Sequence, residues 1–129
     1  MKVSNNLKYT KSHEWVAFLN DTTAKIGITD YAQNELGDLV YVNLPEVGDE
    51  VFAGDTFCDV ESVKAVSDVL SPVSGVIDEV NDEVIDSPAL INEDAYSAWF
   101  ITVRNITDKE DLMDADEYEV FIMDESKKH

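Results

Sequence analysis

Residues 56–72, TFCDVESVKAVSDVLSP, decide the fold of this 129-residue chain. They form two arms rich in strand-forming side chains, with Lys64 near the middle. The arms belong to a strand-like region, from Asp38 to Val80, that proline and glycine interrupt at short intervals. Short strands at this spacing predict a mainly β fold, a small sandwich or barrel. No Asn-Gly or Asp-Gly pair lies between the arms, so turn propensity alone does not predict a hairpin there.

The region before residue 38 predicts a hairpin followed by a short helix. Residues 14–19 (EWVAFL) and 23–28 (TAKIGI) are strand-like runs separated by a three-residue loop. In the next segment Asp30 is placed to cap a helix together with Gln33, three residues later. Gly37 is placed to end that helix.

Two capping-box patterns predict helices in the C-terminal part of the chain. They are Thr107 with Glu110, which predicts a helix through Met113, and Asp114 with Glu117, which begins a second helix with an apolar stripe at Tyr118, Phe121 and Ile122. Helices are therefore expected at about residues 108–124, packed on the sheet. The end of the chain, 119–129, is expected to be partly frayed.

Length and composition fit a single domain that spans residues 1–129. Apolar residues make up 44% of the chain, enough for a core, and no apolar run approaches the roughly 20 residues that cross a bilayer. The start, MKVSNNLKYT, lacks the apolar stretch of a signal peptide. The single cysteine, Cys58, cannot form an internal disulfide, which agrees with a reducing compartment. We therefore expect a protein of a bacterial-type cytoplasm, away from membranes.

The chain is strongly acidic. Its 28 Asp and Glu residues against 9 Lys and Arg residues give a net charge of −19. A field of this sign repels phosphate backbones, so binding to nucleic acid is not expected, and it favours a soluble monomer. Two interpretations stay open: the acidity serves solubility, or it steers the chain towards basic surfaces of partners.

Groups for conventional catalysis are scarce. The only histidines are His13 and His129, so a metal site built from His and Cys is not expected. Cys58 lies beside Asp59 and near Glu61, and these carboxylates oppose formation of a thiolate. A packed thiol is therefore favoured over a nucleophile at this position.

Lys64 has two interpretations. Its immediate neighbours, Val63 and Ala65, are uncharged, and Glu61 and Asp68 flank them. A solvated lysine in a turn explains this pattern. A modification site explains it as well, because a lysine at a protruding tip presents an amine on a flexible stem that a ligase can reach.

The segment around Lys64 also resembles a known family. ESVKAVSDVLSPVSG (61–75) is similar to the lipoylation segment of glycine cleavage H proteins. Four other stretches are similar to that family in its order: YTKSHEW (9–15), GITDYAQNELGD (27–38), LPEVGD (44–49) and INEDAYSAW (91–99). Together they cover nearly the whole chain. One departure is Ser97-Ala98 before Trp99, where the family often has glycines.

The resemblance implies a fold and a set of site residues. The fold is a barrel-sandwich hybrid, lipoyl-domain-like, with two small antiparallel sheets and short helices, notably at the C-terminus. Lys64 is expected to carry lipoic acid through an amide bond. The residues expected to be recognised by the ligase are Glu61, Ser62, Val63 and Ala65. The cleft into which the loaded arm folds back is expected at Ser12, Glu14 and Asp68.

The resemblance also implies a carrier rather than an enzyme. Such a carrier takes the aminomethyl group of glycine from a pyridoxal-phosphate glycine decarboxylase to a tetrahydrofolate-dependent aminomethyltransferase. Dihydrolipoyl dehydrogenase then reoxidises it, and a lipoyl ligase or transferase is the further expected partner. Two alternatives stay open: an H-like protein that relays lipoyl groups to other lipoyl domains, and an acidic decoy that mimics DNA. The decoy accounts for the charge of −19 but not for the Lys64 segment.

Overall fold

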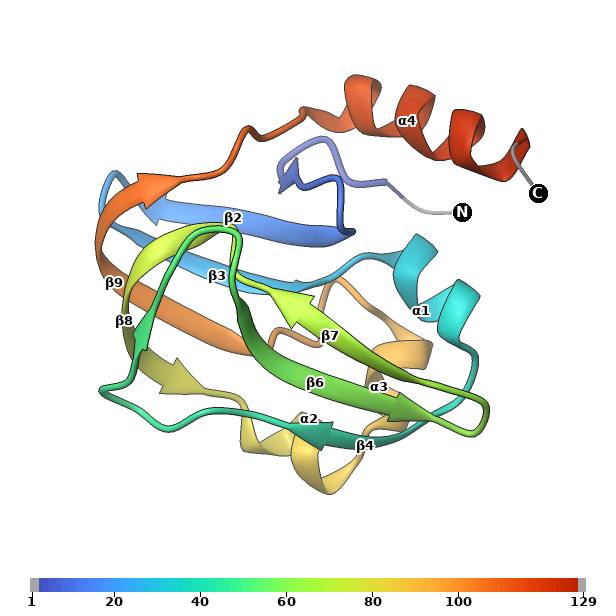
Figure 1. Cartoon of the computed structure of the whole chain (residues 1–129), viewed down its shortest axis with the longest axis horizontal. Helices are drawn as coiled ribbons and strands as arrows, with labels where there is room; N and C mark the ends of the chain where they lie inside the picture. Colours follow the sequence, from blue (N-terminus) through green and yellow to red (C-terminus); the bar gives the residue numbers. More distant parts are fainter. Residues whose placement is uncertain (1–2, 128–129) are drawn as a thin grey trace.

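The computed structural model describes residues 3–127, and side chains as far as residue 125, and it contains two antiparallel sheets with short helices (Figure 1). The six-stranded sheet has the order β1-β2-β3-β9-β8-β5, and the three-stranded sheet the order β4-β6-β7. The strands are β1 (Lys8–Tyr9), β2 (Glu14–Asn20), β3 (Thr23–Ile28), β4 (Leu39–Asn43), β5 (Glu50–Val51), β6 (Thr56–Ser62), β7 (Val66–Leu70), β8 (Val73–Val80) and β9 (Ile101–Lys109). The helices are α1 (Asp30–Leu36), α2 (Asp82–Asp86), α3 (Ala89–Glu93) and α4 (Ala115–Lys127). The expected mainly β fold with short helices is confirmed.

The segment that contains Lys64 is a β-hairpin formed by β6 and β7. Glu61 lies opposite Val66, and Val60 opposite Ser67. Strand β4 pairs with the other side of β6, so β7 is an edge strand. The tip of the hairpin lies beside the chain that leaves α1 (Figure 1).

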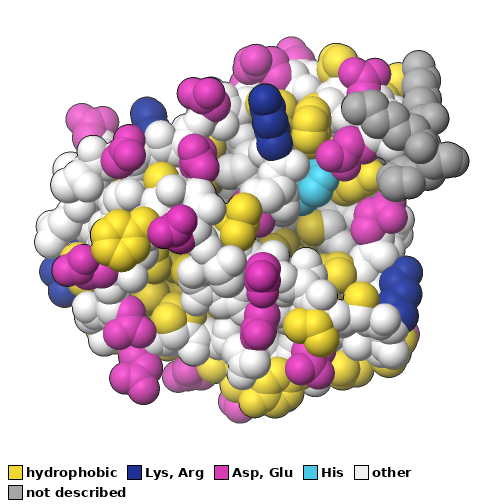
Figure 2. Space-filling view, in the orientation of Figure 1, with side chains coloured by type: hydrophobic (Ala, Val, Ile, Leu, Met, Phe, Trp, Pro, Cys, Tyr) yellow, Lys and Arg dark blue, Asp and Glu magenta, His cyan; other side chains and the backbone are white. Residues whose placement is uncertain are grey.

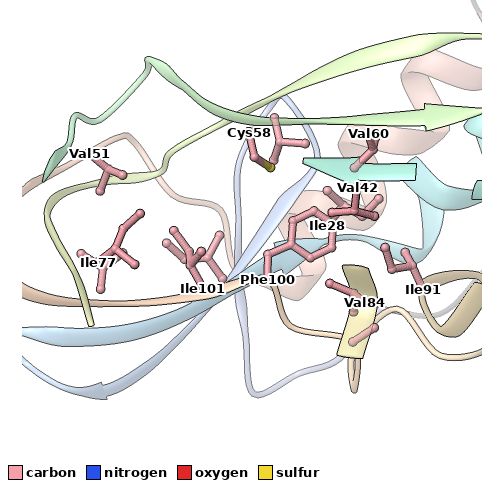
Figure 3. Packing of buried hydrophobic residues seen from close by; sticks show 14 of the residues in the cluster. Ile28, Val42, Val51, Cys58, Val60, Ile77, Val84, Ile91, Phe100 and Ile101 are labelled. Atoms are coloured by element: carbon pink, nitrogen blue, oxygen red, sulfur yellow. The ribbon is translucent and has the colours of Figure 1, made fainter. Parts of the chain in front are cut away.

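The main core fills the space between the two sheets. Figure 3 shows side chains of the three-stranded sheet facing those of the six-stranded sheet, with contributions from α2 and α3. Its members include Val42, Cys58 and Val60 on one side, Ile28, Ile77 and Ile101 on the other, and Val84 and Ile91 from the helices. Burial of each large apolar side chain contributes about 1.5–3 kcal/mol, so this layer holds the hairpin firmly at its base.

A second, aromatic cluster lies between α4 and the edge of the six-stranded sheet. Its buried members are Tyr9, Trp15, Tyr31, Ala115, Tyr118 and Ile122. The rings of Tyr9 and Tyr118 stack with their centroids 4.5 Å apart. Asp114 and Glu117 accept each other's backbone N–H at 2.9 and 3.1 Å, which confirms the predicted capping box at the start of α4.

The helix predicted from Thr107 through Met113 is wrong. Residues 101–109 form β9, which pairs with β3 on one side and with β8 on the other, as far as Lys109 opposite Val73. These ladder bonds outweigh a local capping pattern, because Ile101 and Val103 enter the core at strand spacing. Among the described residues, one helix, α4, follows β9 in place of helices over 108–124. The stretch expected to fray, 119–129, is helical as far as Lys127, and residues 128–129 lie outside the described residues.

The first hairpin and α1 follow the predicted pattern with two small differences. The loop between β2 and β3 has two residues rather than three, because Asn20 pairs with Thr23. Helix α1 ends at Gly37 as predicted, but its cap is the Thr29 side chain, not that of Asp30. No helix within residues 3–127 is long and apolar enough to span a membrane.

Candidate functional site

The tip of the β6–β7 hairpin holds Lys64 in a turn with a fixed backbone and an exposed side chain. The Ser62 hydroxyl accepts the N–H groups of Lys64 and Ala65 at 3.3 and 3.1 Å, and the Ser62 N–H donates to the Ala65 carbonyl at 2.8 Å. The Val63 N–H donates to the Asp38 carbonyl at 3.1 Å, which ties the tip to the start of β4. The turn therefore presents the lysine amine without an ordering step in the backbone.

The residues expected to be recognised by a ligase divide into two groups. Glu61, Val63 and Ala65 are exposed, and Val63 is 73% exposed. Ser62 is buried and supports the turn from inside. A ligase can therefore contact the first group, whereas Ser62 can act only through the shape of the turn.

Sequence reasoning missed a row of exposed side chains beside the tip, with Tyr41 and Val66 on either side of Glu61. Tyr41 lies opposite Glu61, and Glu61 lies opposite Val66, so these three side chains form a row across β4, β6 and β7. Tyr41 and Val66 are both more than half exposed. A bulge in β4 sets this register, and a bulge has no clear signature in the sequence. The one signal that the sequence offers is Tyr41, an aromatic residue in a short strand-like run.

Glu14 and Ser12 lie together at the start of β2. One oxygen of the Glu14 carboxylate accepts hydrogen bonds from the hydroxyls of Thr10 and Ser12. Its other oxygen accepts the Leu70 N–H of edge strand β7 at 3.3 Å. Glu14 is only 2% exposed, whereas Ser12 is exposed. Burial raises the pKa of Glu14, and the hydrogen bonds from Ser12, Thr10 and Leu70 partly oppose that shift.

Two hollows meet at Ser12. One, of about 270 Å³, lies between β7, α1 and α4 and is lined by Ser12, His13, Tyr31, Ala32, Glu35, Leu36, Ser67 and Glu125. The other, of about 390 Å³, is lined by Thr10, Lys11, Ser12, Gly54, Leu70, Ser71, Glu110 and Asp111. The structure thus brings Ser12 and Glu14 together beside β7. Of the three residues expected at the cleft, Ser12 alone lines these hollows: Glu14 is buried, and Asp68 is exposed on β7 opposite Asp59.

The burial of Glu14 predicts a pH dependence of stability. Because its pKa is raised above the ordinary value of 4.5, the folded chain holds this proton more tightly than the unfolded chain. The stability that comes from the protonated group is therefore complete below about pH 4.5 and is lost as the pH rises through the folded pKa. We expect Glu14→Gln to escape this loss, so that its free energy of unfolding in urea improves relative to wild type as the pH rises above 4.5. Parallel pH profiles for the two proteins would contradict this, and Glu61→Gln, at an exposed position, serves as the control.

The described residues include few side chains that are placed for catalysis. No group of three or more His, Cys, Asp or Glu side chains among them is arranged to hold a metal ion. The Cys58 thiol is buried, and burial, then Asp59, Glu14 and Asp68, raise its pKa well above the ordinary value. The interpretation of Cys58 as a packed thiol is confirmed.

Comparisons with known proteins agree on one family. The family model described as glycine cleavage H-protein matches residues 7–125. A glycine cleavage system H protein of Lachnoclostridium phytofermentans is 56% identical over 125 residues, which cover 97% of this chain and 98% of that protein. A probable glycine cleavage system H protein of Pyrococcus horikoshii is 56% identical over 124 residues, 94% and 92% of the two chains. The crystal structure of a glycine cleavage system H protein from Mycobacterium marinum has a TM-score of 0.86 at 42% identity, over 92% and 97% of the chains.

The matched region includes the Lys64 hairpin, the loop that carries Ser12 and Glu14, and most of α4. Proteins of this family are lipoyl carriers of the glycine cleavage system and have no catalytic activity of their own in it. With a family model over nearly the full length and relatives at 56% identity, this chain belongs to the glycine cleavage H-protein family.

Proposed function

We propose that the chain carries a lipoyl group in amide linkage to Lys64, and that it takes the aminomethyl group of glycine from the pyridoxal-phosphate glycine decarboxylase to the tetrahydrofolate-dependent aminomethyltransferase. The observation that carries this proposal is the exposed Lys64 in a turn whose backbone is held by Ser62 and Asp38. Lys64 takes part in no ion pair among the described residues, so its amine is available. When bound, the lipoyl group supplies the disulfide that accepts the aminomethyl group, and dihydrolipoyl dehydrogenase restores that disulfide after transfer.

The hollow between β7, α1 and α4 is the proposed docking site of the loaded arm. A Cβ atom placed on Gly37 would lie 3.7 Å from Lys64 Cε, so the lysine stem runs beside the end of α1. Leu36, the residue before Gly37, lines the hollow. Ser67 on the other wall is three residues from Lys64, a span of at most about 10 Å at roughly 3.3 Å per residue. The hollow therefore begins within reach of the lysine stem.

Ser12 and Glu14 supply the polar end of this docking site. A free amine on a carbon bonded to sulfur has a lone pair that can expel the sulfur, after which water gives formaldehyde and ammonia. Because Glu14 is buried behind Ser12, we assign the first contact to Ser12: its Oγ accepts an N–H of the protonated amine and donates to Glu14. The carboxylate then favours the positive charge on the amine, so the lone pair stays occupied by a proton. Asp68, exposed on β7, adds a more distant negative charge to this docking site.

Reconstitution tests the shuttle. The lipoylated chain, mixed with the decarboxylase, the aminomethyltransferase, tetrahydrofolate, dihydrolipoyl dehydrogenase and NAD+, is expected to sustain reduction of NAD+ to NADH when glycine is added. The unlipoylated chain is the control. A lipoylated chain that gives no NADH, yet donates its lipoyl group to another lipoyl domain when a lipoyl transferase is present, would replace the shuttle by the relay.

The acidic surface is proposed to steer these encounters. Figure 2 shows Asp and Glu side chains spread across one face of the molecule, with few Lys and Arg side chains among them. The screening length is about 8 Å at physiological salt, so we expect the on-rate to each partner enzyme to fall about tenfold or more from low to high ionic strength. Stopped-flow association measures this, and the off-rate is expected to change little. On-rates that stay flat would leave solubility as the role of the acidity.

A further inference from the structure

His13, between Ser12 and Glu14, has an uncommon backbone conformation. Its φ of 72° lies in the left-handed region, which residues with a β-carbon rarely adopt. Such a conformation persists only where the surroundings impose it. At His13 the N–H donates to the Thr10 carbonyl at 3.1 Å, and the carbonyl accepts the Thr29 N–H at 3.0 Å.

The imidazole ring of His13 joins the loop to α4. Its Nδ1 lies 2.9 Å from the Tyr118 hydroxyl, and its Nε2 lies 2.8 Å from Glu125 Oε2. The Tyr118 hydroxyl also lies 2.7 Å from the Thr29 hydroxyl, which caps α1. In the neutral tautomer with hydrogen on Nε2, the ring donates to Glu125 and accepts from Tyr118, while Tyr118 accepts from Thr29. This chain of hydrogen bonds connects both helices that border the smaller hollow.

The groups that surround the His13 ring come from two helices, α1 and α4. Tyr31 of α1 lies 4.7 Å from the ring, centroid to centroid, and Phe121 of α4 lies at 5.7 Å. Glu125 lines the hollow together with His13 and Ser12. The ring is thus held at its faces and at both nitrogens, whereas the neighbouring Ser12 side chain, hydrogen-bonded to Glu14, lines the hollow.

We propose that His13 is a positioning residue, through which α4 fixes Ser12 at the hollow and Glu14 behind it, and so controls how long the loaded arm stays docked. Two features of the structure around His13 support this proposal. The left-handed turn at His13 lets the side chains on either side of it meet, as the hydrogen bond from Ser12 to Glu14 requires. Glu125, which holds the ring, also forms part of the wall of the hollow. This inference rests on the proposed docking of the arm at Ser12 and Glu14.

Substitutions on α4 test the proposal while Ser12 and Glu14 stay unchanged. Glu125→Ala removes the acceptor for Nε2, and Asp124→Ala removes the same charge from an exposed neighbour on the same helix. His13→Asn removes the bridge, while asparagine tolerates the left-handed backbone. We expect Glu125→Ala and His13→Asn to accelerate formaldehyde release from the loaded carrier about three- to tenfold, the size of one lost hydrogen bond, and Asp124→Ala to leave it unchanged. In the unlipoylated chain, amide hydrogen exchange at His13 and Glu14 is expected to accelerate in the same two variants.

A double-mutant cycle separates positioning from a general loss of structure. If His13 acts through Ser12, then His13→Asn combined with Ser12→Ala releases formaldehyde no faster than Ser12→Ala alone. Additive effects, or wild-type release from Glu125→Ala, would overturn the inference while the docking proposal stands. If Ser12→Ala and Glu14→Gln themselves leave the rate of formaldehyde release unchanged, the docking proposal is wrong, and the inference about His13 is wrong with it. Glu125→Ala keeps the test decisive if His13→Asn does not fold, because Glu125 lies at a partly exposed position.

Discussion

Lys64→Arg is expected to abolish lipoylation of the chain completely. A ligase forms the amide by attack of an unprotonated ε-amine, and the guanidinium of arginine stays protonated and does not form that bond. The hydrogen bonds that hold the turn come from the backbone and from Ser62, so the variant keeps the shape that a ligase recognises. Intact mass after expression with a lipoate ligase measures the result.

Other lysines provide the matched controls for this experiment. Lys11→Arg changes an exposed lysine that borders the larger hollow, and it is expected to leave the lipoyl mass in place. Peptide mapping of the wild-type chain is expected to place the whole lipoyl mass on the peptide that contains Lys64. A lipoyl mass on the Lys64→Arg protein, or on any other lysine, would refute the proposed attachment site.

Loss of the Glu14 charge is expected to shorten the lifetime of the loaded carrier by about tenfold to a hundredfold. That range treats the ammonium, the Ser12 hydroxyl and the Glu14 carboxylate as one charge-assisted hydrogen-bonded chain of roughly 1.5–3 kcal/mol, which sets the fraction of arms that are docked. Glu14→Gln is the better variant, because its amide oxygen can still accept from the Thr10 and Ser12 hydroxyls, whereas alanine would leave these hydroxyls and the Leu70 N–H without any acceptor. The carrier is loaded, the enzymes are removed, and formaldehyde release is timed.

Two other acidic residues serve as comparisons in this measurement. Glu35 also lines the smaller hollow but is exposed, so Glu35→Gln is expected to change release little. Asp68→Asn is expected to have a smaller effect than Glu14→Gln, because solvent screens an exposed charge. Equal release from wild type and Glu14→Gln would remove Glu14 from the proposed mechanism.

The sequence predicts those parts of the fold that depend on local patterns. The first hairpin, the end of α1 at Gly37 and the capping box of Asp114 with Glu117 follow from residues within a few positions of one another. The capping pattern of Thr107 with Glu110 is equally local, yet it fails because β8 supplies partners for Asp108 and Lys109 from far along the chain. Local patterns thus predict an element only where no distant strand competes for its backbone.

The candidate site also has parts that follow from local sequence and parts that depend on distant contacts. The exposed lysine in a turn follows from the residues around Lys64 and from the family resemblance. The burial of Glu14 does not, because it depends on Leu70, 56 residues away. The left-handed backbone of His13 depends on hydrogen bonds to Tyr118 and Glu125, more than 100 residues away, and on the Thr29 N–H. These contacts exist only once both sheets and α4 are assembled.

The position of β7 at the edge of its sheet has a consequence for association between molecules. An edge strand exposes N–H and C=O groups that can template a strand from another chain, which is a route to aggregation. Here the Glu14 carboxylate accepts the hydrogen bond of the Leu70 N–H, and the exposed Asp68 places a charge on the same strand. Either feature discourages the addition of a further strand. Glu14 and Asp68, which are proposed to stabilise the loaded arm, therefore also block the edge of β7 against pairing with a strand of another molecule.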